Sequence, residues 1–157
     1  RRSERAVSRA VAGDVQTRWQ AENRDGRWIN SALLLTARLK DGTALLRQRI
    51  EGKPLCINGQ PNNQSDIVQS MFFSVYIEKI QPYMSTVTQG RVALIEPFEQ
   101  LAEMQRAVMP ESFAGWYERH LSQSAEASLW RELDVAMMAH TKAWQELLGQ
   151  CGLRPGA

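Results

Sequence analysis

The sequence predicts an all-α protein, an antiparallel bundle of about five to six helices. The main reason is the spacing of apolar residues, which recur every three or four positions along most of the chain. The last predicted helix, 124–148, shows this best, with a stripe made of Leu129, Leu133, Met137, His140, Trp144 and Leu148. A second reason is that the segment 28–51 is rich in Leu, Ala and Arg, which favour helices.

The first predicted helix covers residues 3–23, with Ser3 as its N-cap. One face of this helix is apolar every fourth residue, at Val7, Val11, Val15 and Trp19. The pair Asp25-Gly26 then predicts a turn. Residues 1–2 and 154–157 are expected to be frayed ends.

The segment 28–51 allows three interpretations, which differ at Asp41-Gly42. A helical hairpin would break at this pair, a β-hairpin would use it as a type I′ turn, and a continuous helix would pass through it. Strands favour β-branched and aromatic residues, which are scarce on both sides of the pair. The sequence therefore favours helix, with or without a break.

Residues 52–64 carry two Pro, two Gly and three Asn, which predicts a long loop. A third helix is expected to begin at Asn63 or Ser65, and Pro82 is expected to end or kink it. Because its apolar residues cover two faces, this helix is expected to be the most buried one. Two stretches, 72–80 and 91–95, also allow interpretation as strands.

The C-terminal part of the chain predicts three further helices. One runs from Pro97 to Val108, and Pro110 begins a short one. The last helix, 124–148, is expected to have Gly149 as its C-cap and to pack against the helix over 67–80.

Length and composition indicate a single helical domain, 1–157. Of the 157 residues, 43% are hydrophobic and 23% are charged, which is typical of a globular domain. The formal net charge of +2 is too small to indicate nucleic-acid binding. The arginines concentrated in residues 1–18 favour a solvated helix face, and membrane contact through this basic segment is the less favoured interpretation.

Cys56 and Cys151 both fall in turn-like sequence, which is consistent with a disulfide between them. A disulfide predicts an oxidising compartment, periplasmic or otherwise extracytoplasmic. Two free thiols would instead favour the cytoplasm. Neither cysteine belongs to a C-x-x-C pair, which argues against redox and zinc motifs.

The sequence contains no recognisable catalytic, metal or nucleotide motif. His120 and His140 lack the spacing of metal ligands, and Glu99 and Glu103 have the spacing of an exposed helix face. We therefore expect no catalytic residue, metal or cofactor. If the protein is an enzyme, the first suspects are His120, Glu103 and Glu118.

The function that the sequence favours is a non-enzymatic protein-interaction or accessory domain, whose partner is another protein. Its candidate surface for a partner or ligand consists of aromatic residues, namely Trp116, Tyr117, Trp130 and Trp144. The same aromatics at helical spacing are also typical of a core. The alternative function is a helical small-molecule-binding or sensor domain with a pocket between helices. The sequence does not determine the oligomeric state.

Overall fold

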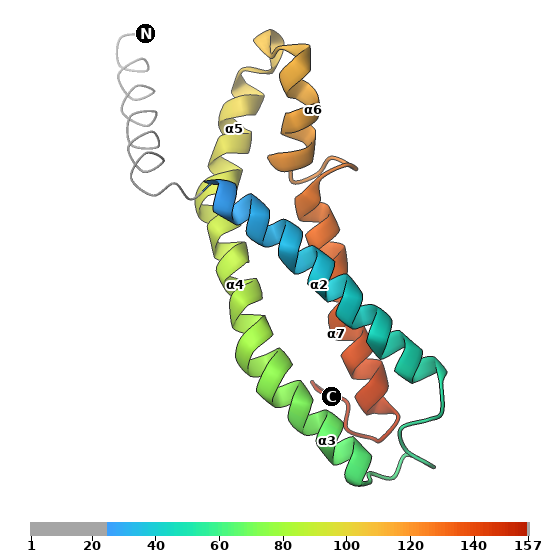
Figure 1. Cartoon of the computed structure of the whole chain (residues 1–157). Helices are drawn as coiled ribbons and strands as arrows, with labels where there is room; N and C mark the ends of the chain where they lie inside the picture. The colour runs from blue at the N-terminus through green and yellow to red at the C-terminus, as the bar shows by residue number, and fades with distance from the viewer. Residues whose placement is uncertain (1–24, 157) are drawn as a thin grey trace.

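The computed structural model describes residues 25–156, which form helices and connecting loops without a strand (Figure 1). These residues make four continuous helices. Three of them are α2 (Asp25–Glu51), α6 (Glu111–His120) and α7 (Leu129–Gly149). The fourth is a long helix that joins α3 (Asn63–Met71), η1 (Phe72–Ile80), α4 (Gln81–Gly90), η2 (Arg91–Ile95) and α5 (Glu96–Met104). The all-α prediction is confirmed, with fewer helices than expected in this part of the chain.

The predicted helix 3–23 and the basic segment 1–18 lie outside the described residues. Asp25-Gly26 does not form the predicted turn, because both residues belong to the first turn of α2. No helix in the range 25–156 combines the length and the apolar character that a membrane crossing requires.

Helices α2 and α7 lie side by side and run in the same direction, whereas the long helix runs antiparallel to both (Figure 1). Two ion pairs between the helices show this shared direction, because Lys40 pairs with Glu132 and, further along both helices, Arg47 pairs with Glu146. The expected antiparallel order therefore holds for the long helix and not for this pair. The reason is that the long helix returns the chain to the end of the molecule where α2 began. Helix α7 then runs in the same direction as α2.

Helix α2 passes through Asp41-Gly42 without a break, so the β-hairpin and the helical hairpin are both wrong. Gly42 is needed for packing against α7, because a Cβ at this position would lie 2.9 Å from Cε1 of His140. The next residue, Thr43, donates a hydrogen bond from its hydroxyl to the Leu39 carbonyl, 2.7 Å away. Tight contact with α7 thus outweighs the low helix propensity of glycine.

The long helix also continues through both of its prolines, so the expectation that Pro82 ends the helix is wrong. Each proline follows a π-helical stretch by two residues, η1 before Pro82 and η2 before Pro97. In both places the residue before the proline donates its N–H five residues back, from Gln81 to Tyr76 and from Glu96 to Arg91. The wider helix accommodates the proline ring, which would clash with the carbonyl of an ordinary α-turn. The strand interpretations of 72–80 and 91–95 are wrong.

Helix ends follow their local capping residues. Asn62 caps α3 in a capping box with Ser65, which confirms the predicted start near Asn63. Helix α5 ends at Met104, before the predicted Val108, and a 3₁₀ turn (Arg106–Val108) follows it. Helix α7 starts later than expected because the Ser128 hydroxyl accepts from the N–H of Trp130, 3.1 Å away.

The start of α6 at Glu111 agrees with the helix predicted from Pro110. At the other end of α7, Gly149 is the last helical residue rather than the cap. The left-handed conformation beyond this helix belongs to Gly152, with φ of 69°.

Two clusters of buried side chains form the core. The Trp130 cluster lies near the start of α2 and α7 and comprises Ala32, Leu35, Leu39, Val87, Ile95, Tyr117, Leu121, Leu129, Trp130, Leu133 and Ala136. The Trp144 cluster lies near their ends and comprises Leu46, Leu55, Cys56, Phe72, Tyr76, Ala143, Trp144, Leu147, Leu148 and Cys151. Ile80 and Met84 pack against both clusters.

The most buried helix is α7, not the predicted helix that begins at Asn63. Helix α7 contributes nine buried residues because it packs against both α2 and the long helix. By contrast, the outer face of the long helix leaves Ile67 70% exposed and Phe73 49% exposed. The expected contact of α7 with 67–80 is present at Phe72 and Tyr76, but α2 is the more extensive partner.

Candidate functional site

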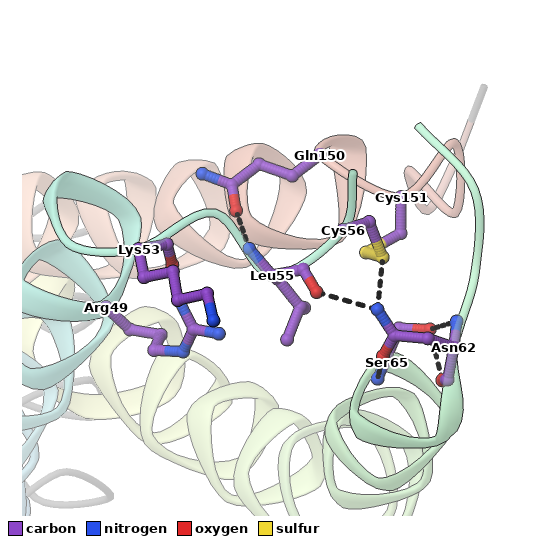
Figure 2. The surroundings of a disulfide bond; sticks show 8 residues. All are labelled: Arg49, Lys53, Leu55, Cys56, Asn62, Ser65, Gln150 and Cys151. Atoms are coloured by element: carbon purple, nitrogen blue, oxygen red, sulfur yellow. Dashed lines mark hydrogen bonds between the residues drawn. A yellow bond between two sulfur atoms is a disulfide. The ribbon is translucent and has the colours of Figure 1, made fainter. Parts of the chain in front are cut away.

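The loop after α2 is fixed to the end of α7 by a disulfide between Cys56 and Cys151, which confirms the predicted pair (Figure 2). Both cysteines are buried, with their Cα atoms 5.2 Å apart. Around the bridge, the Asn62 side chain donates to the Leu55 carbonyl at 2.9 Å, and the Leu55 N–H donates to the Gln150 side chain at 2.9 Å. The disulfide end of the molecule is therefore closed by covalent and polar contacts.

Beside the disulfide, aromatic rings of η1 and α7 pack together in the Trp144 cluster. The ring of Phe72 lies 5.3 Å from that of Trp144, and the ring of Tyr76 lies 5.2 Å from that of His140. The Tyr76 hydroxyl is hydrogen-bonded to that of Thr141 at 2.6 Å. This packing makes the cluster part of the core, with its polar atoms satisfied.

His140 lies beside this cluster, and its hydrogen bonds correspond to a neutral ring. The indole N–H of Trp144 donates to Nε2 of His140 at 3.0 Å, so Nε2 must carry a lone pair. The proton therefore sits on Nδ1, which lies 3.1 Å from the Thr43 hydroxyl oxygen. Burial lowers the pKa of His140 below its usual value, and the Leu39 carbonyl offsets part of this effect.

An apolar groove opens between α2 and the long helix, above the ring of His140. Its cavity volume is about 330 Å³. Its walls are formed by Leu34, Leu35, Leu39, Ile80 and Tyr83, and its rim carries Arg38 and Lys79. Gly42 also lines the groove, on the α2 side next to the ring of His140. The size and lining are those of a small-molecule site.

At the opposite end from the disulfide, α5 and α6 form a hairpin (Figure 1). We call its exposed apolar side chains the tip surface, which consists of Leu101, Met104, Val108, Phe113 and Trp116. Met104 is 82% exposed and Val108 is 79% exposed. A pit of about 80 Å³ between Ala102 and Phe113 hollows this end of the hairpin.

The hairpin is held together by a buried tyrosine of α6. The Tyr117 hydroxyl donates to the Glu103 carboxylate of α5, which also pairs with Arg106 at 2.6 Å. Burial, together with the hydrogen bond to Glu103, raises the pKa of Tyr117 far above its usual value. A second carboxylate of α5, Glu99, accepts from the backbone N–H of Gln123 at 2.8 Å. These glutamates thus hold α5 to its neighbours.

A glutamate of α7 links the hairpin to the rest of the bundle. Glu132 accepts from Lys40 of α2 at 2.5 Å and from Arg119 of α6 at 3.0 Å. The hydrogen bond from Lys40 lowers the pKa of Glu132, and the hydrogen bond from Arg119 lowers it further. Nearby, Arg91 of η2 pairs with Asp134 of α7 at 2.7 Å.

The structure divides the four aromatics that the sequence proposes as a binding surface. Trp116 is 44% exposed and belongs to the tip surface. Tyr117, Trp130 and Trp144 are buried in the two clusters, so they contribute to the core that the sequence also allowed. A partner or ligand role therefore remains a prediction for Trp116.

Sequence reasoning did not identify the groove as a site, and it identified only Trp116 of the tip surface. One sequence signal for the tip was a turn at Pro110 that is flanked by the apolar residues Met104 and Phe113. The groove carried none, because its walls come from distant segments, around Leu34 and around Lys79. Within residues 25–156, no group of His, Cys, Asp and Glu side chains has the arrangement of a metal site.

A family model described as "Protein of unknown function (DUF3080)" matches residues 1–155. The chain belongs to this family. No curated protein and no solved structure matches it. For this DUF3080 member, any function therefore has to be argued from its own residues.

Proposed function

We propose that the protein is a non-enzymatic, extracytoplasmic interaction domain that binds another protein through the tip surface. The observation that carries this proposal is the exposure of Met104 and Val108 at the end of a well-packed hairpin. Solvent-exposed apolar side chains that gather in one place are typical of interaction sites. Methionine and aromatic residues are also enriched where proteins bind one another.

The shape of the tip indicates what the partner presents to it. The pit beside Phe113 has a volume of about 80 Å³, which suits one aliphatic side chain of the partner. Phe113 and Trp116 stand next to it, with ring centroids 5.4 Å apart. Tryptophan is enriched in binding hot spots, which lie in well-packed pockets, so Trp116 beside this pit fits such a site.

Support for a non-catalytic role comes from the side chains that the sequence singled out for chemistry. His140 uses both ring nitrogens in hydrogen bonds, and Nδ1 of His120 lies 3.0 Å from the Trp116 carbonyl. Glu103 is shared by Tyr117 and Arg106. These hydrogen bonds stabilise the fold. A general acid or base must instead be able to form a hydrogen bond with its substrate.

Support for an extracytoplasmic location comes from the bridge between Cys56 and Cys151. Disulfides form and persist in oxidising compartments and are rare in the cytosol. The bridge ties two segments 95 residues apart, as expected of a stabilising rather than a catalytic disulfide.

Site-specific photocrosslinking in the native compartment tests the proposal. A benzophenone amino acid replaces Val108 at the tip, and the matched control carries it at Leu45, which is 67% exposed on α2. We expect a discrete crosslinked protein from position 108 and none from position 45. The change Trp116→Asp should abolish this product while leaving thermal unfolding unchanged.

Two outcomes of this experiment would reject the proposal. One is the same product from both positions, which would indicate non-specific contact. The other is flotation of the protein with lipid vesicles through the tip, without a protein crosslink, which would make the tip a membrane contact.

A further inference from the structure

The groove between α2 and the long helix is separate from the tip surface and has its own chemistry. Its cavity volume of about 330 Å³ falls at the lower end of the range for small-molecule sites. Three leucines of α2 face Ile80 and Tyr83 across it. It lies where the π-helical stretch η1 ends and where α2 carries Gly42, so both walls are shaped by local backbone features.

The floor of the groove offers no free hydrogen-bonding atom from His140. Nε2 of this ring accepts from Trp144, and Nδ1 is engaged with Thr43. The ring therefore presents carbon atoms to the cavity. A polar group placed at this depth would lose its hydrogen bonds to water without replacement, so the floor favours hydrocarbon.

The rim of the groove is positively charged. The side chain of Lys79 makes no ion pair or hydrogen bond with any residue in the range 25–156. Arg38 pairs with Asp41 at 3.0 Å, but its side chain is 70% exposed and can reorient. Among the described residues, none of those that line the groove is acidic. The rim is thus complementary to an anion.

From this combination we propose that the groove binds a free medium-chain fatty acid. Its hydrocarbon chain lies against Leu34, Leu35 and Ile80, and its carboxylate lies at Lys79. The cavity lies at the lower end of the range for small-molecule sites, which suits a single hydrocarbon chain of medium length. Burial of apolar surface supplies the affinity, and Lys79 selects the sign of the head group.

Calorimetric titration of the full chain with decanoate tests the proposal. Decyltrimethylammonium is the matched ligand, since it has the same chain length and the opposite charge. We expect saturable binding of one decanoate per chain, at least about tenfold tighter than binding of the cation. Absence of saturable decanoate binding, or equal affinity for both ligands, would overturn the proposal.

Matched substitutions locate the binding. Leu34→Asp places a charge at the exposed wall of the groove and should weaken decanoate binding at least about tenfold. Leu45→Asp, on an exposed part of the same helix outside the groove, should leave it unchanged. Lys79→Gln should weaken it about threefold, the usual size of an exposed ion-pair effect.

A tip variant separates this proposal from the proposed function. Val108→Glu should abolish partner binding at the tip surface and leave decanoate binding intact. Loss of decanoate binding in Val108→Glu, with retention in Leu34→Asp, would place the ligand on the tip and would show the groove assignment to be wrong.

Discussion

The disulfide end and the tip of the α5–α6 hairpin are built in opposite ways. At the disulfide end, Cys56, Cys151 and the Trp144 cluster are buried, and a capping box and side-chain amides satisfy the backbone. At the tip, α5 contributes no buried residue, and Met104 and Val108 are about four-fifths exposed. The same chain thus uses its apolar residues for folding at one end and leaves them exposed at the other.

This difference indicates where stability and function reside. Local stability follows buried apolar area and satisfied polar groups, both of which concentrate around α2, α7 and the long helix. The tip depends on a few contacts, notably the hydrogen bond from Tyr117 to Glu103. Changes at the disulfide end should therefore alter folding, and changes at the tip should alter binding.

The largest effect on stability is expected from removal of the disulfide. Cys56→Ala with Cys151→Ala opens a loop of 95 residues, and the free energy of unfolding should fall by about 4–5 kcal/mol in the chain-entropy model. Denaturant unfolding with and without the substitutions measures this. Under non-reducing alkylation, protein from its native compartment should gain no alkyl group before the bridge is reduced.

Gain of two alkyl groups by the native material would show free thiols and contradict the extracytoplasmic location. A loss below about 1 kcal/mol would mean that the Trp144 cluster alone closes this end.

The next, smaller effect on stability is expected from substitution of two glycines. Gly90 lies in the long helix and Gly115 lies in the α5–α6 hairpin. A Cβ at Gly90 would overlap the ring of Trp28, a residue of α2 that packs against the long helix at this point. Gly90→Ala should therefore lower the free energy of unfolding by about 1–3 kcal/mol. In Gly115→Ala no atom lies within 4 Å of the new Cβ, so helix propensity should raise stability by up to about 1 kcal/mol.

Thermal or denaturant unfolding of both variants measures the difference. If Gly90→Ala does not lower stability, the close approach of Trp28 to Gly90 does not limit packing, and the contrast between the two regions fails at this point.

Much of the helical content could be predicted from the sequence because it depends on local signals. The stripe from Leu129 to Leu148 predicts α7, and Asn62 and Ser65 mark the start of α3. The disulfide could be anticipated because both cysteines lie in turn-like sequence.

What the sequence could not predict depends on contacts between distant residues. Continuation through Pro82 requires the π-helical stretch before it, for which the sequence carries no known signal. The burial of Trp130 and Trp144 depends on which face of α7 meets α2, and periodicity alone does not distinguish a core aromatic from a binding one. The groove at Leu34 and Lys79 exists because of how α2 crosses the long helix.

The smallest expected effect concerns pH and again belongs to the disulfide end. Burial lowers the pKa of His140 in the folded state, so the unfolded chain takes up the proton first as the pH falls. The contribution to stability is complete above the unfolded value of about 6.5 and is lost progressively below it. Denaturant unfolding between about pH 7 and pH 5, a range above most carboxylate titration, should show stability decreasing with acidification.

Two variants identify His140 as the source of this slope. His140→Gln removes the titrating group and should flatten the pH profile, although its stability at pH 7 should be lower because hydrogen bonds to Thr43 and Trp144 are lost. Trp144→Phe keeps the histidine but removes the donor to Nε2, which frees that nitrogen to accept a proton in the folded state. Its profile should therefore be shallower than that of the unaltered protein. If the slope of stability against pH is unchanged in His140→Gln, the pH dependence comes from other groups. The disulfide end would then not differ from the tip in its pH dependence.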